Sequence, residues 1–551
     1  MRGRALTRMC AGLLAVSLAG VSCGGDDDSG ATAQAEAATV TSSPSTGSSA
    51  STASTASTQP LPVDPDGVLR IAADFTTVGG LKLDPATILN SVYVGMLYLI
   101  YGTPIRPGTE PGTYRPGLAE SFEVVNPTTF TMTLRPGLRF HNGAPYDAET
   151  VREGILRLKD PKYAGLNQSF LSQISDVQAA GNTVTVSFAT PIAGLAPAVF
   201  SRHEGMFPPP GYTDIERNPV GAGPYRFVSY DEQRLVLEKW GESWDADDYH
   251  LKRIEYVQAA AGQAALNALQ AGQVDLITVN PINVEELQSS DRFDVVVNDL
   301  DAFYYLAFCA DHAPVDSLEV RQAIAAALDR SAINQAVQDG LGKVQVGLWP
   351  RGTPYAVDVI EQQVGPDLDN ARQLLEESGV ADPALTIVVQ GNQPLQVQLA
   401  EIIQGQLREI GMDVTILPSV NVSLDFITGE SPKGQLGTTI NTSGGVLKLT
   451  SQPGLRRTAG IDNGCQFQDD RLVELAAELT AIAPDDPRAG VLWAEVQQIV
   501  YDNAYAVPLM TQSADFAFDK GKVAGIGPGV STPVVTSVAN PFLDGVYIIK
   551  K

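Results

Sequence analysis

The sequence predicts an α/β protein with two or three lobes. Its 551 residues exceed what one hydrophobic core ordinarily organises, so the chain is expected to divide. In the second half, helical patterns at residues 369–378 and 397–410 alternate with strand patterns at residues 385–389 and 412–417. This alternation is typical of a mostly parallel sheet that is covered by helices.

The charge and the cysteines narrow the class of protein. A formal net charge of -26 argues against a surface that neutralises nucleic-acid phosphates. Of the four cysteines, Cys309 and Cys465 lie in the folded body. In an exported protein they could form a disulfide, and the alternative is two buried thiols. No CxxC motif occurs, so neither a zinc ribbon nor a redox dithiol is expected.

Residues 1–22 have the pattern of a secretory signal peptide. Three arginines precede an apolar stretch that is shorter than the ~20 residues needed to span a bilayer. The stretch ends in the letters GVSC, which resemble a bacterial lipobox, although Gly20 stands where leucine is usual. We expect Cys23 to be lipidated, and the alternative is an ordinary signal peptide with a chance cysteine. Residues 23–65 are rich in Ser, Thr, Ala and Gly, which predicts a disordered tether.

Local patterns predict the first elements of the body. A buried strand is expected at residues 68–73, and an apolar helix over residues 86–101 follows the letters LDP. Residues 130–135 alternate as a half-buried strand, and Asn142-Gly143 predicts a tight turn. Asp147 is then placed to cap a helix that begins near Ala148. The stretch 135–151 is therefore a scaffold of strand, turn and helix.

Six blocks along the body form a recognisable series. They are RPGLAESF (115–122), RPGLRFHNGAPYDAETV (135–151), NPVGAGPY (218–225), ALNALQAGQVDL (265–276), RQAI followed by DR (321–330), and AYAVPL (504–509). In this order they resemble the family 5 extracellular solute-binding proteins, the dipeptide, oligopeptide and nickel-type receptors of ABC importers. The NPVGAGPY block lacks a third glycine at dinucleotide-motif spacing and precedes a strand, so we interpret it as a structural turn.

The resemblance implies a periplasmic-binding-protein-like fold of the class II type, with two large lobes around a ligand cleft and a third subdomain inserted into the first lobe. The domains implied are a signal peptide at 1–22, a lipidated cysteine and tether at 23–65, lobe I at 66–102, an inserted subdomain II at 103–205, lobe I again at 206–302, lobe III at 303–500, and the end of lobe I at 501–551.

A search for catalytic groups finds little. The four histidines (His141, His203, His250 and His312) form no HExxH motif or close pair, and neither a GxSxG elbow nor a P-loop occurs. We therefore expect no enzyme activity, no cofactor and no metal site. Each histidine is expected to be a structural or surface group.

Residues that face the ligand can be assigned only by comparison with the family that the chain resembles. The residues it suggests are Ile88, Leu89, Asn90, Tyr304, Tyr305, Ile440, Asn441, Thr442 and Ser443. For one of the two tyrosines, core packing of an apolar strand is the alternative. Peptide-binding members carry a Trp and an Asp that anchors the peptide amine; here Asn441 and Gly444 occupy those positions. Either the usual anchor is absent, or the alignment is shifted, or an acid such as Asp462 takes the role.

The expectation is a lipid-anchored, monomeric protein outside the cytoplasm. It would capture a peptide or another small polar solute and deliver it to the membrane subunits of an ABC importer, without binding nucleic acid. Two alternatives remain at this stage. They are a cell-surface receptor or scaffold that does not serve transport, and a secreted enzyme on a binding-protein fold.

Overall fold

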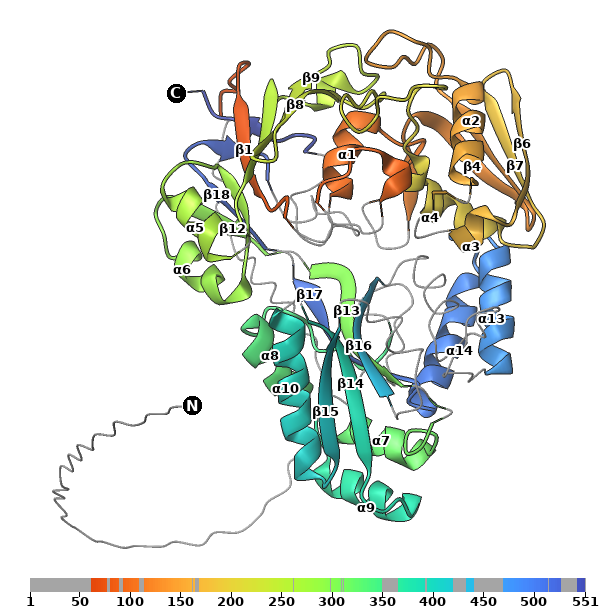
Figure 1. Ribbon diagram of the computed structural model, residues 1–551, viewed down its shortest axis with the longest axis vertical. Helices are drawn as coiled ribbons and strands as arrows, with labels where there is room; N and C mark the ends of the chain where they lie inside the picture. The colour runs from red at the N-terminus through yellow and green to blue at the C-terminus, as the bar shows by residue number, and fades with distance from the viewer. Residues whose placement is uncertain are drawn as a thin grey trace, which may run out of the picture. The chain divides into compact units, whose positions relative to one another are not determined.

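The computed structural model describes most of the folded body. It covers residues 61–550 apart from 77–79, 89–92, 109–112, 161, 164–167, 261, 298, 309, 311, 349–364, 392–393, 420–432, 441–468, 514 and 527–542. Cys23, Cys309 and Cys465 therefore lie outside the described residues, and the lipidation and the disulfide stay predictions. The three larger sheets of the described body have seven, five and four strands (Figure 1).

The seven-stranded sheet forms lobe I. Its order is β12-β18-β11-β1-β10-β9-β8. Its strands are β1 Val68–Ala73, β8 Tyr225–Tyr230, β9 Arg234–Lys239, β10 Arg253–Gln258, β11 Leu276–Val279, β12 Phe293–Val296 and β18 Asp515–Asp519. Strand β1 runs parallel to β10 and β11, whereas the outer pairs are antiparallel. Helices α5 (Gln263–Gln270) and α6 (Val284–Gln288) contact β11 and β12 respectively.

Helix α1 (Val94–Tyr101) begins later than the helix predicted at 86–101. Asp84 instead caps one 3-10 turn, Pro85–Thr87, by accepting a hydrogen bond from the backbone N of Ala86 at 3.0 Å. The next residue is extended, so the LDP motif starts a turn rather than the long helix. All eight residues of α1 are buried, which explains why its sequence is apolar on every side.

Two of the recognised blocks meet at the C-terminal end of α1. The backbone N of Gly223 donates to the carbonyl of Ile100 at 2.9 Å, one of the carbonyls that a helix end leaves unpaired. The backbone N of His141 donates to the carbonyl of Gly221 at 2.9 Å. A Cβ on Gly221 would lie 2.1 Å from the Ile100 oxygen, so a side chain has no room there. The interpretation of NPVGAGPY as a structural turn is confirmed.

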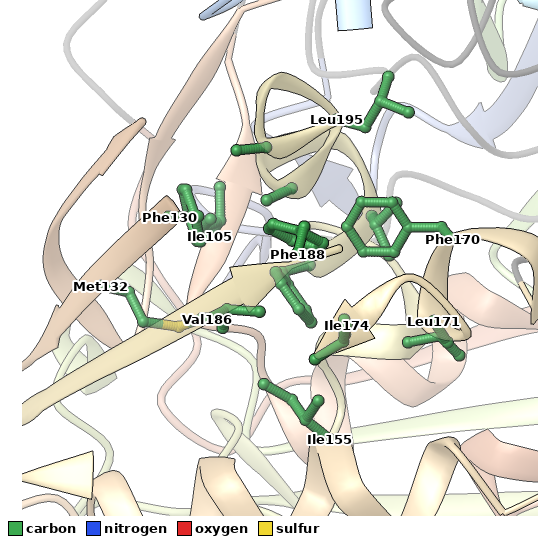
Figure 2. Close-up of a cluster of buried hydrophobic side chains, with 14 of the residues drawn as sticks. Ile105, Phe130, Met132, Ile155, Phe170, Leu171, Ile174, Val186, Phe188 and Leu195 are labelled. Atoms are coloured by element: carbon green, nitrogen blue, oxygen red, sulfur yellow. The ribbon is translucent and has the colours of Figure 1, made fainter. Parts of the chain in front are cut away.

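The inserted lobe II is a four-stranded antiparallel sheet with helices on one face. Its order is β4-β5-β7-β6. Its elements are β4 Ala119–Asn126, β5 Thr129–Leu134, α2 Ala148–Leu158, α3 Gln168–Leu171, β6 Ile174–Ala180, β7 Thr183–Phe188 and α4 Ala196–Phe200. Figure 2 shows its core, in which Phe130 and Met132 of β5 and Val186 and Phe188 of β7 lie with Ile155 of α2. Asp147 caps α2, as the sequence predicted, and the structure adds a reciprocal capping box with Thr150.

The five-stranded sheet forms lobe III. Its order is β15-β14-β16-β13-β17. Its elements are β13 Asp299–Phe308, α7 Leu318–Ala327, α8 Arg330–Gln338, α9 Leu368–Ser378, β14 Ala384–Gln390, α10 Pro394–Glu409, β15 Asp413–Ser419, β16 Lys433–Ile440, α13 Asp470–Ala481, α14 Ala489–Asp502 and β17 Ala506–Ser513. Two-stranded ribbons pair β2 Ile105–Pro107 with β3 Tyr114–Pro116, and β19 Val523–Ala524 with β20 Tyr547–Ile548.

The prediction of a mostly parallel sheet in lobe III is wrong for half of its strand pairs. Strand β14 pairs in parallel with β15 and β16, but β13 pairs antiparallel with β16 and β17. The reason is that β13 and β17 arise from chain crossings and not from the alternation of helices and strands. One crossing leads from β12 in lobe I to β13, and the other returns from β17 to β18 (Figure 1). The predicted boundary residues of the lobes stay predictions.

The arginines of the fifth block hold lobe III together. Arg321 Nε donates to the carbonyl of Asn503 at 2.9 Å, and Arg330 Nε donates to the carbonyl of Pro508 at 2.9 Å. Both side chains belong to buried residues, 5% and 4% exposed. These contacts fasten α7 and α8 to the chain as it returns toward lobe I, so the block is structural.

Candidate functional site

The candidate site begins at one edge of the lobe I sheet. The parallel strands β1, β10 and β11 end at this edge, at Ala73, Gln258 and Val279. In open α/β sheets, ligands bind in the crevice outside the carboxyl ends of the parallel strands. The chain leaves this edge through Asp74 and Phe75, on its way to the predicted ligand-facing stretch at 88–90.

The first residues beyond β1 form a hydrogen-bonded cluster. One carboxylate oxygen of Asp74 accepts from the hydroxyl of Thr76 at 2.6 Å, from its backbone N at 2.9 Å, and from Gln258 Nε2 at 3.2 Å. Gln258 Oε1 accepts from the backbone N of Phe75 at 2.7 Å. Burial by itself raises the pKa of Asp74, but the bonds from Thr76 and Gln258 outweigh it and hold that pKa below its usual value. This part of the edge therefore carries a fixed negative charge.

Aromatic and apolar side chains surround this cluster. The Phe75 and Tyr230 rings meet edge to face at 5.3 Å, and the Tyr93 hydroxyl donates to the carbonyl of Asp74 at 2.8 Å. Ile88 is 5% exposed and belongs to the hydrophobic core of lobe I. Leu89 and Asn90 lie outside the described residues. Ligand contact by the stretch 88–90 therefore stays a prediction.

The two predicted tyrosines of lobe III lie on opposite faces of β13. Tyr304 is 9% exposed and packs in one core with Leu306 and Phe308, whereas Tyr305 is 5% exposed and belongs to a different core with Phe303. Burial raises the pKa of Tyr304 to about 12, and a hydrogen bond with Gln512 opposes part of that shift. Both rings are thus largely core groups, and ligand contact by either stays a prediction.

The third predicted group is only partly described. Strand β16 ends at Ile440, whose backbone pairs with Ala302 of β13, while Thr438 pairs with Tyr304. The structure therefore brings Ile440 and the two tyrosines into neighbouring strands of one sheet. Residues 441–444 and Asp462 lie outside the described residues. Whether the usual amine anchor is absent stays a prediction.

Sequence reasoning missed a pair of buried amides beside the crossing from lobe III to lobe I. Gln338 Nε2 donates to the carbonyl of Thr511 at 2.8 Å, and its Oε1 accepts from the backbone N of Ser513 at 3.1 Å. Asn334, one turn earlier on α8, donates to the carbonyl of Gly342 at 2.6 Å. Residues 334 and 338 lie on the buried side of α8 together with Ile333 and Val337. Two amide side chains at positions where the helix pattern calls for apolar residues were the feature of the sequence that could have revealed this pair.

These groups can bind but offer no evident catalytic set. Among the residues that the structure describes, no group of three or more His, Cys, Asp or Glu side chains could hold a metal ion. His203 lies 3.1 Å from the Glu204 carboxylate inside lobe II's connection to lobe I, and burial lowers the pKa of this histidine. In the described part of the chain, no helix is long and apolar enough to cross a bilayer.

Two lobes joined by crossing strands, with a third sheet inserted into the first lobe, define a periplasmic binding protein of the class II type. The binding protein AgaA from A. tumefaciens R10, solved with agropinic acid, has this fold. It superposes with a TM-score of 0.72 at 21% identity, over 88% of this chain and 99% of that one. The chain belongs to the bacterial extracellular solute-binding proteins, family 5, because the model of the family's middle region matches residues 113–436.

Curated relatives differ in what their names say they bind. The glutathione-binding protein GsiB of Pectobacterium atrosepticum is 25% identical over 54% of this chain and 60% of its own length. The nickel-binding periplasmic protein of Escherichia coli is 26% identical over 56% of this chain and 63% of its own length. The matched region thus spans less than two thirds of these two relatives.

Proposed function

We propose that this chain captures a small solute outside the cytoplasm and delivers it to an ABC importer. The observation that carries the proposal is the pair of strand crossings between lobes I and III, beside the carboxyl edges of both parallel strand sets. Two crossing strands allow hinge rotation, and the strand edges supply polar groups to a ligand between the lobes. Membership of family 5 supports the same role.

The ligand we favour is a peptide or another small polar solute. The names of relatives point to glutathione, nickel and agropinic acid, three ligands of different chemistry, so none is transferred directly. Residues 437–445 read GTTINTSGG, a segment with hydroxyl and amide groups but no carboxylate. Burying a peptide ammonium without a carboxylate is costly, which favours a neutral or hydroxylated ligand, or one held through its backbone.

We further propose that Cys23 carries a lipid that anchors the chain, as a monomer, to the outer face of the cell membrane. The tether that follows Cys23 would then let the folded body move in water near the importer. Each part of this proposal is open to separate test, because anchoring and solute binding reside in different segments.

The test is native mass spectrometry of the protein purified from its own host. A peptide, sugar-like or other polar solute bound at one equivalent would support the proposal and identify the ligand. A ligand-free chain that binds nothing from a panel of peptides, opines and metal–amino-acid complexes in calorimetry would contradict it. Turnover of any panel member by the purified chain would instead favour an enzyme.

A further inference from the structure

We propose that lobe II forms a latch with lobe III, a contact centred on Gly194 that stabilises the closed arrangement of the lobes. The latch is the contact between the 3-10 turn Ala193–Leu195 of lobe II and the C-terminal end of α13 in lobe III. It would form as lobes I and III close and break as they open. The inference rests on the proposed function, in which the lobes close around a solute.

Lobe II is fastened to lobe I and should move with it. Arg157 of α2 forms an ion pair with Asp84, in which Nη1 lies 3.0 Å from Oδ1. Arg106 donates to Asp245 at 2.5 Å, and both side chains are nearly inaccessible to solvent. The backbone N of His141 in lobe II donates to the carbonyl of Gly221 in lobe I at 2.9 Å, which adds a third connection. Breaking a buried charge pair is strongly destabilising, so we expect lobe II to stay attached to lobe I when the lobes move.

Helices α13 and α14 are connected to lobe III. Gln322 Nε2 of α7 donates to the carbonyl of Asp502, the last residue of α14, at 2.9 Å. Trp493 of α14 lies in one buried cluster with Tyr305 of β13, and this cluster continues into the core of lobe II at Phe130. Helix α14 leads directly into β17, and the carbonyl of Tyr505, in between, accepts from the backbone N of Phe308 at 3.3 Å. Because α14 continues into β17, we expect the hairpin to move with the five-stranded sheet.

The contact itself is unusually close. A Cβ built on Gly194 would lie 1.8 Å from the carbonyl oxygen of Ile482 and 2.8 Å from that of Thr480. The three atoms nearest to that Cβ all belong to lobe III, and the φ of Gly194 is not in the left-handed region. Alanine at 194 is thus compatible with the backbone of lobe II, and what it meets is the partner lobe. Figure 2 shows the neighbouring Leu195 at the edge of the labelled group of side chains, and Leu195 shares its buried cluster with Leu479 and Ile482 of lobe III.

Rotation at the two crossings must change this contact. The turn at 193–195 moves with lobe I, and the end of α13 moves with lobe III. In the described chain these two lobes are joined by the connections from β12 to β13 and from β17 to β18. Closing brings the carbonyls of residues 480 and 482 onto Gly194, and opening separates them. The closed state gains packing that the open state lacks, so a side chain at 194 should shift the equilibrium toward the open state.

The test is amide hydrogen exchange of the ligand-free full body, which needs no solute and is therefore independent of whether one is found. In Gly194→Ala, exchange of residues 480–482 and of residues 193–195 should rise by about tenfold or more over wild type, because overpacking disfavours the contact. Strands β5 and β7 should exchange as in wild type, which shows that lobe II is folded. The matched control is Gly490→Ala in α14, where a Cβ would meet no atom within 4 Å and exchange should not change.

A second variant acts from the other lobe. Ile482→Ala leaves lobe II intact in sequence but loosens the end of α13, so exchange of residues 193–195 should again rise. Wild-type exchange at both segments in both variants would overturn the proposal. Faster exchange of β5 and β7 in Gly194→Ala would also overturn it, since the glycine would then serve the folding of lobe II.

Discussion

At the scale of single residues, His141 couples the stability of the fold to pH. Its Nε2 lies 3.0 Å from the carbonyl of Gly223 and its ring meets Trp240 at 4.9 Å. Burial lowers the pKa of His141 to about 4, below its usual 6.5. In the unfolded chain the imidazole takes up a proton below pH 6.5, whereas in the folded chain it stays neutral until about pH 4. The folded state therefore loses stability as the pH falls through this interval.

We predict that His141→Gln weakens this loss. Glutamine can still donate to the Gly223 carbonyl but does not titrate, so up to about 3 kcal/mol of the acid-dependent change in unfolding free energy should disappear. The measurement is urea denaturation at pH 7 and pH 4.5. The control is His250→Gln at an exposed position, which should keep the wild-type difference between the two pH values. Equal pH dependence in wild type and His141→Gln would contradict the assignment.

Asp275 is the second residue with a defined energetic role. It is 1% exposed, and its carboxylate accepts from Arg70 at 2.8 Å and from Lys522 at 2.6 Å, which joins β1 to the C-terminal part of lobe I. These ion pairs explain why the block at 265–276 contains an aspartate. The sequence alone showed the block as a motif and did not indicate what the aspartate contacts.

We predict that Asp275→Asn lowers the unfolding free energy by about 3 kcal/mol, because it leaves two cations without their buried partner. The matched control is Asp519→Asn in the same lobe, whose ion pair with Arg292 is partly exposed and should be worth under about 1 kcal/mol. Denaturant unfolding of the two variants measures the difference. Similar losses of unfolding free energy in the two variants would show that burial does not make the ion pairs of Asp275 more stabilising than the partly exposed pair of Asp519.

At the scale of elements, the NPVGAGPY block closes the end of α1. A Cβ at residue 221 would meet the backbone oxygen of Ile100 at 2.1 Å and the Cα of Tyr101 at 2.5 Å, and backbone atoms cannot move aside as a flexible side chain can. We predict that Gly221→Ala costs about 3 kcal/mol of unfolding free energy through overpacking and loss of the helix-end hydrogen bonds. Gly241→Ala serves as the control, since its Cβ would meet nothing within 4 Å. A variant at 221 that unfolds at the wild-type urea concentration would refute the packing argument.

Element type was predictable where local chemistry decides it. The Asp147 cap, the alternation at 130–135 and the apolar α1 segment required only neighbouring residues, and the structure has α2, β5 and α1 there. The start of α1 was not predictable, because Asp84 caps a short turn whose continuation depends on Arg157 and Glu216 from elsewhere in the chain. Strand direction in lobe III was missed for the same reason, since pairing of β13 with β17 is decided about 200 residues apart.

At the scale of the whole molecule, anchoring is separable from folding. If Cys23 is the lipidated residue, Cys23→Ser should move the protein from the membrane fraction of its host to the soluble fraction. The melting temperature of the body should stay within about 1 °C, because the substitution lies before the expected tether and outside the folded body. Fractionation and immunoblotting measure this. The control is Cys10→Ser. Residue 10 lies inside the expected signal peptide, so the mature protein of this variant should remain in the membrane fraction. A Cys23→Ser protein that stays with the membrane would contradict lipidation at this residue.

The sequence by itself determined the α/β class, the expected export signal, the local elements and, through six ordered blocks, the family. Those features depend on short-range periodicity, capping and turn residues, which the chain displays directly. The tertiary structure decided what the blocks do: His141 and Gly221 meet at the end of α1, Asp275 joins two cations, and Gly194 meets lobe III. Such roles require contacts between distant segments, and a linear sequence does not state which of its residues will touch.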